Sequence, residues 1–233
     1  MNSYSTAAAQ VILPHVVAPW SHMELHQTSW QDVIEYSDLV VAFGGLPLRN
    51  TQVAYGGITE HNSARDMRQA SERGVTFCNI SPLQQDMPAW LNAQTLMPRP
   101  GTDVALMLGL AYVLEHESLL DRGFLHSHCE GYARFRDYLL GHSDGVAKTP
   151  EWAAQLADVD AAALVQLARR MAAERTFITA AWSLQRADHG EQPYWMVVTL
   201  AAMLGQIGMP GGGFGFGYAA EGFIGSNHRR FNW

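Results

Sequence analysis

The stretch Asp38-Leu39-Val40-Val41-Ala42-Phe43-Gly44-Gly45 decides the fold of this 233-residue chain. Its apolar run is short, contains β-branched residues and ends at two glycines, which is typical of a strand buried on both faces. Val75–Ile80, closed by Ser81-Pro82, repeats the pattern, and Arg175–Ala181 gives it again as the last strand we expect. Thr95-Leu96-Met97 is a weaker candidate. Strands of this kind belong to parallel sheets.

Segments with helical character separate these strands. From Thr102 onward, Val104, Met107, Leu108, Ala111 and Leu114 form one apolar stripe at helical spacing, and a side-chain oxygen of Thr102 or Asp103 is expected to cap that helix. Further helices are expected at 60–73, 118–129, 132–140, 150–156, 158–174 and 192–207. The alternation predicts an α/β fold: three layers, a mostly parallel twisted sheet with helices on both faces, Rossmann-like, with a small helical insert at about 115–155.

A glycine-rich run follows the expected helix at 192–207. The run 211–217 is a poor phosphate-binding loop, because it follows a helix instead of a strand and lacks a Lys-Ser/Thr pair. We expect a helix terminator that leads into a flexible connector. The predicted organisation is a nucleotide-binding α/β domain at 1–207 and a glycine-rich connector at 208–233 to a missing downstream domain.

Composition excludes several classes of function. The 15 Lys+Arg against 22 Asp+Glu give a net charge of −7, which argues against nucleic-acid binding. No apolar stretch reaches the roughly 20 residues of a membrane span. Two cysteines and the cluster His126-Ser127-His128-Cys129 do not make a metal site, since no second cluster matches it. Only 16% of residues are charged, against about 25% in a typical domain. We therefore expect exposed apolar patches that other protein normally covers, and self-association of the chain alone.

The candidate site lies where the predicted strands end. Ligands of open parallel sheets bind beyond the carboxyl ends of strands, and the loops found there are 44–50, 81–86 and 182–191. Gly101-Thr102-Asp103 opens a helix whose free N–H groups can face an anion or a base edge. Two arginines, hydroxyls, glycines and a tryptophan suit a nucleotide-like ligand with phosphates. The alternative is ordinary βα loops with solvated arginines.

Several segments, in order along nearly the whole chain, resemble the dimethyl sulfoxide reductase family of molybdopterin oxidoreductases. Its branch of trimethylamine-N-oxide, dimethyl sulfoxide and biotin sulfoxide reductases is the nearest. The segments are Tyr4–His15, Gln27–Trp30, Gly101–Gly109, Lys148–Ala153, Trp182–Arg186, His189–Met196 and Leu200–Gly213 (LAAMLGQIGMPGGG). Two positions depart from the family: Ser81-Pro82 stands where Asp-Pro or Asn-Pro is frequent, and Ala7 where glycine is usual.

The resemblance implies the central domain of a longer enzyme that holds molybdenum between two molybdopterin guanine dinucleotides. The positions that match cofactor contacts are Arg49, Asn50, Ile80, Ser81, Gly101, Thr102, Asp103, Trp182, Ser183 and Arg186. No catalytic residue and no metal ligand is assigned, because Ser5, the serine nearest the family's ligand position, lacks the Ser-Tyr-Gly setting.

The implied function is oxygen-atom transfer from an S-oxide or N-oxide, with the isolated chain inactive. The implied partners are the remaining domains of the parent polypeptide, the small oxide substrate, and an electron donor protein or reduced cofactor; neither nucleic acid nor a membrane span is expected. The parent is expected to be bacterial, in the periplasm or the cytoplasm. The alternative is a non-catalytic nucleotide- or partner-binding α/β module. A nicotinamide dehydrogenase domain is disfavoured, because no GxGxxG follows the first strand.

Overall fold

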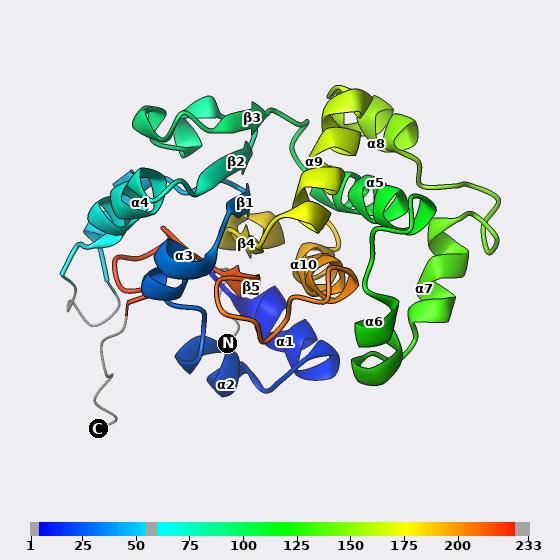
Figure 1. Ribbon diagram of the computed structural model, residues 1–233, viewed down its shortest axis with the longest axis horizontal. Coiled ribbons are helices and arrows are strands. Elements are labelled where there is room, and N and C mark those ends of the chain that lie inside the picture. Colours follow the sequence, from blue (N-terminus) through cyan, green and yellow to red (C-terminus); the bar gives the residue numbers. More distant parts are fainter. Residues whose placement is uncertain (1–4, 55–59, 227–233) are drawn as a thin grey trace.

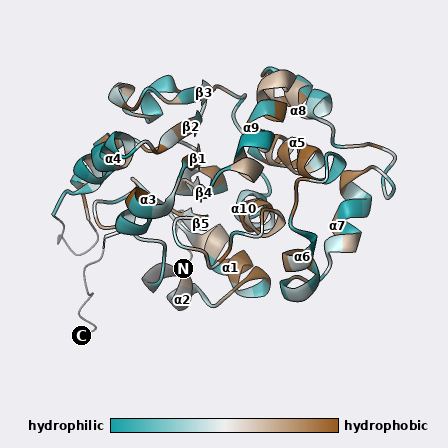
Figure 2. Ribbon diagram, viewed as in Figure 1, coloured by the Kyte–Doolittle hydropathy of each residue, from teal (hydrophilic) through white to brown (hydrophobic). Residues whose placement is uncertain are grey.

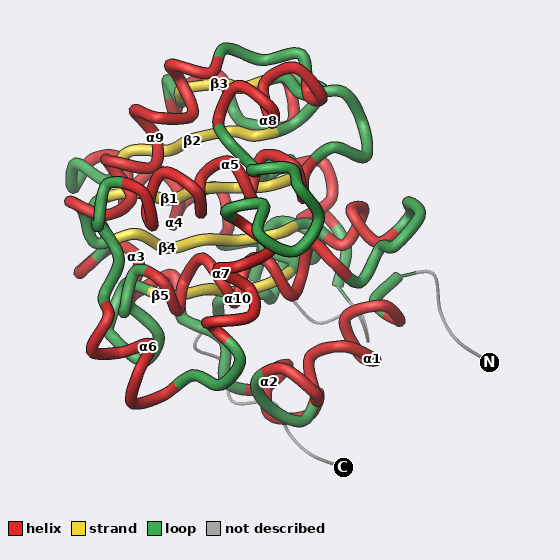
Figure 3. Tube along the Cα trace, turned by 90° about the vertical axis from the view of Figure 1, so that its right-hand side faces the viewer, coloured by secondary structure: helices red, strands yellow, loops and turns green. Residues whose placement is uncertain are grey.

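The centre of the molecule is a five-stranded parallel sheet (Figures 1 and 3). The computed structural model describes residues 5–54 and 60–226. The strands are β1 (Leu39–Phe43), β2 (Thr76–Ile80), β3 (Gln94–Leu96), β4 (Thr176–Ala180) and β5 (Gly213–Phe216), in the spatial order β3-β2-β1-β4-β5. Every neighbouring pair is parallel, which confirms the expected sheet.

Both faces of β1 are buried, as its unbroken apolar run predicts. Val41 lies opposite Cys78 on β2 and Ile178 on β4. Leu39, Val41 and Phe43 join the hydrophobic core on one face, while Val40 and Ala42 join a second core on the other. The sheet therefore needs a layer of helices on each side.

Helices supply those two layers. The helices are α1 (Ala7–Val16), α2 (Trp20–Leu25), α3 (Trp30–Tyr36), α4 (Ser63–Glu72), α5 (Asp103–His116), α6 (Arg122–His128), α7 (Tyr132–Leu139), α8 (Pro150–Ala157), α9 (Ala161–Ala173) and α10 (Gln192–Met203). α3 and α4 lie on one side of the sheet, and α5, α9 and α10 lie on the other (Figure 1). α5 and α10 carry mostly hydrophobic residues along their length (Figure 2), because they pack on each other and against neighbouring elements. The three-layer architecture is thus confirmed.

Two local expectations were wrong. Residues 213–216 of the glycine-rich segment do not form a flexible connector. They form β5, which pairs with β4 and places Phe214 opposite Ile178. The α5 start is not capped by a side chain: the Thr102 hydroxyl instead donates to the Arg99 carbonyl oxygen at 2.7 Å. The expected downstream domain stays a prediction, and residues 227–233 of the expected connector lie outside the described part of the chain, as does Tyr4.

The helical insert is anchored to α5 by one buried carboxylate. The side chain of Glu115 is 3% exposed and accepts hydrogen bonds from Arg136 Nε at 2.5 Å and the Tyr132 hydroxyl at 2.7 Å. Arg122 Nη2 lies 3.4 Å from Oε1, the same oxygen that accepts from Arg136. Burial alone would raise the pKa of Glu115, but these hydrogen bonds and the two arginine charges outweigh it and lower the pKa below the ordinary 4.5.

We expect the protein to lose stability in acid through Glu115. A lowered pKa in the folded state means that the unfolded chain binds the proton more tightly, so the contribution is present above pH 4.5 and lost as the pH falls below it. Glu115→Gln should lower the free energy of unfolding near neutral pH by about 1–3 kcal/mol and flatten its decline in acid. Urea unfolding at several pH values measures both. Glu72→Gln, at an exposed position at the end of α4, is the control and should change little; equal slopes for Glu115→Gln and the unmodified protein would contradict the prediction.

Three of the segments that follow strands carry an exposed apolar side chain. Val53, Leu83 and Met97 follow β1, β2 and β3, and are 62%, 54% and 57% exposed. Their position is where other protein could cover them, although self-association stays a prediction. Within residues 5–54 and 60–226, none of the helices combines the length and hydrophobicity that crossing a bilayer requires.

Candidate functional site

The strand order places a switch point between β1 and β4. From β1 the chain continues to β2 and β3 on one side, then returns to form β4 and β5 on the other. The connections on the two sides of this point run in opposite directions, and ligands of open parallel sheets bind at the carboxyl edge beside such a point. After β1 comes the 3-10 helix Leu48–Gln52, and after β4 comes the 3-10 helix Trp182–Gln185. The candidate residues of both loops thus lie beside this switch point.

Two glycines at the end of β1 bring three loops into contact. Gly44 has φ +87, and a Cβ there would lie 2.6 Å from the Cβ of Ala181 in the loop after β4. Gly45 has φ +73, and a Cβ there would lie 2.5 Å from the carbonyl oxygen of Asp86 in the loop after β2. Only glycine combines this left-handed backbone with such close approach. The loops after β1, β2 and β4 are consequently packed against one another.

One of the two candidate arginines is held by a carboxylate. Arg49 Nη2 donates to Asp86 Oδ1 at 2.5 Å, and the Ser81 hydroxyl donates to Asp86 Oδ2 at 2.7 Å. The Arg49 side chain is still 58% exposed, so its remaining N–H groups face solvent. Ser81 is 1% exposed and Ile80 is fully buried in the core, the Ile80 carbonyl oxygen accepts from the Gly44 N–H, and the Ser81 N–H donates to the Leu96 carbonyl oxygen, so neither residue is exposed to a ligand in this structure. Asn50 is exposed beside Arg49.

The start of α5 and the loop after β4 hold two charges without partners. Burial raises the pKa of Asp103, and its carboxylate makes a hydrogen bond only within its own residue among the described residues. Arg186 is exposed, and no described residue forms a hydrogen bond or ion pair with its guanidinium. Both charges act on the pKa of Tyr194, which Arg186 lowers and Asp103 raises. Above Gly101, whose φ is +80, nothing lies within 4 Å of a would-be Cβ.

An aromatic cluster supports the loop after β4. The ring of Trp182 packs 5.6 Å from that of Trp20, 5.6 Å from that of Tyr194 and 6.0 Å from that of Phe216. The Tyr194 hydroxyl donates to the carbonyl oxygens of Ala181 and Trp182, each at 3.2 Å. Trp182 is therefore half-buried and fixed, and Ser183 beside it is exposed. Burial is also the main reason that the pKa of Tyr194 is raised, so its hydroxyl stays protonated.

All ten candidate positions thus lie at the carboxyl edge, but they differ in what they offer. Side chains of Arg49, Asn50, Asp103, Ser183 and Arg186 face outward or are partly exposed, whereas those of Ile80 and Ser81 point inward. The sequence reasoning missed two supporting residues, Asp86 and Tyr194. Asp86 lies in the candidate loop 81–86, but a single acidic residue in a polar loop does not show which residues it will bind.

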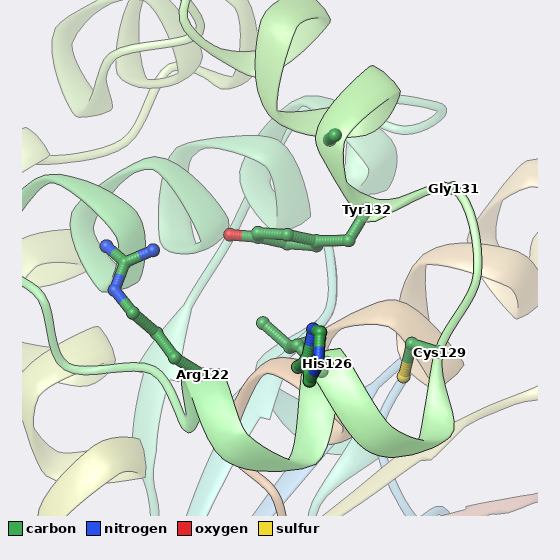
Figure 4. A pocket seen from close by; sticks show the side chains of 7 residues that line it. Arg122, His126, Cys129, Gly131 and Tyr132 are labelled. Carbon is green, nitrogen blue, oxygen red and sulfur yellow. The ribbon is translucent and has the colours of Figure 1, made fainter.

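A separate hollow lies in the helical insert, between α6 and α7. Its volume is about 320 Å³, and Figure 4 shows Arg122, His126, Cys129 and Tyr132 around it. The Tyr132 hydroxyl and Arg122 are already bound to Glu115. Among the described residues, no three His, Cys, Asp or Glu side chains are grouped to hold a metal ion. The hollow is also remote in the chain from the strand ends, so the sheet edge remains the stronger site.

The comparison with known families decides the affiliation. The family model described as molybdopterin oxidoreductase matches residues 1–229. The chain belongs to the molybdopterin oxidoreductase family. Membership implies a cofactor of molybdenum and pterin, and it confirms the resemblance on which the candidate positions rest.

Individual relatives place this molybdopterin oxidoreductase chain within the family. It is 44% identical to the dimethyl sulfoxide/trimethylamine N-oxide reductase of Cereibacter sphaeroides over 93% of its length. It is 42% identical to the trimethylamine-N-oxide reductase of Haemophilus influenzae over 93%, and 39% identical to the biotin sulfoxide reductase of Cereibacter sphaeroides over 97%. It covers 26%, 26% and 30% of these three proteins. The chain is therefore a molybdopterin oxidoreductase domain of the dimethyl sulfoxide/trimethylamine N-oxide reductase type, about a quarter of its relatives' length.

One solved structure shares the fold of this chain. Acetylene hydratase from Pelobacter acetylenicus superposes with a TM-score of 0.63 over 87% of this chain and 25% of that one, at 20% identity. At that identity the likeness shows the fold alone.

Proposed function

We propose that the chain is the domain that binds molybdopterin guanine dinucleotide in a longer reductase of S-oxides or N-oxides. The observation that carries this proposal is the pair of charges without partners at the carboxyl edge of the sheet, the Arg186 guanidinium and the half-buried Asp103 carboxylate. A buried carboxylate without a cation is unfavourable unless a ligand satisfies it. One positive and one negative side chain without partners suit a ligand that has both an anionic part and neighbouring N–H donors.

The donors and acceptors at this edge fit a guanine nucleotide. The Arg186 and Arg49 guanidinium groups suit the oxygens of a diphosphate, since planar N–H pairs match phosphate geometry. The Asp103 carboxylate can accept from the two adjacent N–H groups on the guanine edge. The open space above Gly101 lets a ligand approach the main chain. In the proposed complex these residues bind and orient the nucleotide, and the rigid ring of Trp182 borders it.

In the proposed enzyme the cofactor carries out the reaction, and this domain holds the cofactor. When bound, the molybdenum centre supplies the exchange of an oxygen atom with the substrate. The chain's own residues would fix the distant end of the cofactor, with two guanine dinucleotides per molybdenum in the proposed enzyme. The proposed substrates are trimethylamine-N-oxide, dimethyl sulfoxide or biotin sulfoxide. The proposal also includes that the 233-residue chain alone is inactive.

The alternative of a non-catalytic module makes a different prediction for the natural-length protein. Such a module would keep the sheet without molybdenum, and loss of Arg186 would leave its behaviour unchanged.

We expect Arg186→Ala to lower the cofactor content of the natural-length protein. Losing one charge-assisted contact to phosphate should weaken binding about tenfold or more. Molybdenum by mass spectrometry and guanine nucleotide released by acid measure the content per polypeptide. Arg134→Ala is the matched control, because Arg134 is an exposed arginine on α7 that likewise has no partner among the described residues. A protein with neither molybdenum nor guanine, and no response to Arg186→Ala, would support the module instead.

A further inference from the structure

We propose that Asp86 is a positioning residue that presents the Arg49 guanidinium to the phosphates of a bound nucleotide. The inference rests on the proposed function and adds a residue to it. The carboxylate of Asp86 is 13% exposed, whereas the Arg49 side chain that it binds is 58% exposed. The Asp86 side chain is therefore mostly buried, and Arg49 is the member of the pair that extends into solvent.

The backbone and side chain of Asp86 are fixed from several directions. Its carbonyl oxygen accepts from the Leu46 N–H at 2.6 Å, which ties the loop after β2 to the loop after β1. Its Oδ2 accepts from the Ser81 hydroxyl at 2.7 Å, and that same hydroxyl oxygen accepts from the Leu83 N–H at 3.3 Å. The close approach of Gly45 leaves no room for Asp86 to shift toward β1. A carboxylate held in this way can define one orientation for its partner.

The orientation given to Arg49 leaves donors for a ligand. Asp86 Oδ1 binds only Nη2 of Arg49, while a guanidinium carries five N–H groups in one plane. Holding one corner of that plane removes rotamer freedom before a ligand arrives, which lowers the entropy cost of binding. The opposing effect is that the carboxylate cancels part of the positive charge. The two effects predict opposite results when Asp86 is removed.

The same network assigns a role to Ser81. Its hydroxyl is buried, and its single O–H group donates to Asp86 while the oxygen accepts from the Leu83 N–H, so the side chain neither reaches a ligand nor has a donor left for one. Ser81 thus acts on the nucleotide through Asp86 and Arg49. Ser81→Ala should weaken nucleotide binding in the same direction as loss of Asp86, but less.

The test measures GDP and guanosine binding by calorimetry to the natural-length protein produced without cofactor. We expect Arg49→Ala and Asp86→Ala each to weaken GDP binding about tenfold while guanosine binding, which lacks phosphates, is unchanged. Asp86→Asn, which keeps an acceptor for Arg49, should recover part of the loss. The control is Glu174→Ala, which removes a partly buried carboxylate (27% exposed) from its pair with Arg170 (33%) at the opposite edge of the sheet, where Arg170 also donates to Thr76 at the start of β2.

The outcomes separate this inference from the function on which it rests. If Asp86→Ala binds GDP as tightly as the unmodified protein or more tightly, Asp86 competes with phosphate and the positioning role is overturned while the site stands. If Asp86→Ala weakens GDP and guanosine equally, Asp86 only supports the loop, and the positioning role is again overturned. If the unmodified protein binds neither GDP nor guanosine, the proposed function falls, and this inference with it.

Discussion

Asp103→Asn is expected to weaken GDP binding about 100-fold and, at the same time, to stabilise the ligand-free protein. The amide presents a donor where guanine also presents donors, so one buried hydrogen bond is lost and one group is left unpaired. Stability moves the other way because burial raises the pKa of Asp103. A raised carboxyl pKa in the folded state means that ionisation near neutral pH favours unfolding, and the neutral amide avoids that cost.

Two comparisons make this result specific. The unmodified protein should prefer GDP to inosine diphosphate, which lacks the exocyclic amino group, and Asp103→Asn should abolish that preference. Asp160→Asn is the control, because Asp160 also stands at the start of a helix, where it caps α9 by accepting from the Ala162 N–H at 3.0 Å. It should change neither GDP affinity nor the unfolding midpoint. Unchanged GDP affinity in Asp103→Asn would remove Asp103 from the site.

Gly44→Ala is expected to lower the free energy of unfolding by about 2–5 kcal/mol. A left-handed backbone costs a residue with a Cβ roughly 1–2 kcal/mol, and overpacking adds about 1–3 kcal/mol. The second contribution arises because the new Cβ would lie 2.6 Å from the Cβ of Ala181, an atom that moves only with its backbone. Relief of this clash must separate β1 from the loop after β4, so GDP affinity should fall as well.

The chain supplies its own control for backbone strain. Gly74 has φ +96, and nothing lies within 4 Å of a would-be Cβ there. Gly74→Ala should therefore show the strain alone, about 1–2 kcal/mol, and leave GDP affinity unchanged. Urea unfolding of both variants isolates the clash. Equal losses for the two variants would show that the contact with Ala181 relaxes freely.

The sequence was a good guide to the central strands and a poor guide to β5. Residues 39–43 and 176–180 are buried on both faces; the first segment is an unbroken apolar run, and the second combines apolar residues with β-branched threonines. β5 contains two glycines, and glycine usually weakens a strand. Glycine is needed at position 215 because of contacts with other parts of the chain: a Cβ there would lie 2.5 Å from the ring of Tyr218 and 2.8 Å from that of Phe177. A residue chosen by tertiary contact gives no local signal.

For the candidate site, the topology predicted where the residues lie, but not which partners their side chains contact. Loops at the carboxyl ends of parallel strands must share one edge, so Arg49, Asp103 and Arg186 were correctly expected there. Which side chains turn outward depends on partners that only the folded chain brings together. Ser81 shows this, since its hydroxyl is taken up by Asp86, five positions away. Whether the ten positions contact a cofactor stays a prediction.

The position of β1 in the middle of the sheet has a consequence for folding during synthesis. The hydrogen bond from the Arg175 N–H to the Asp38 carboxylate spans 137 positions of the chain. At about 5–20 residues per second, the segment that becomes β4 is synthesised on the order of ten seconds after β1. Until then one edge of β1 is open, and the switch point between β1 and β4 does not exist. A nascent chain therefore cannot complete the candidate site before β4 has been made.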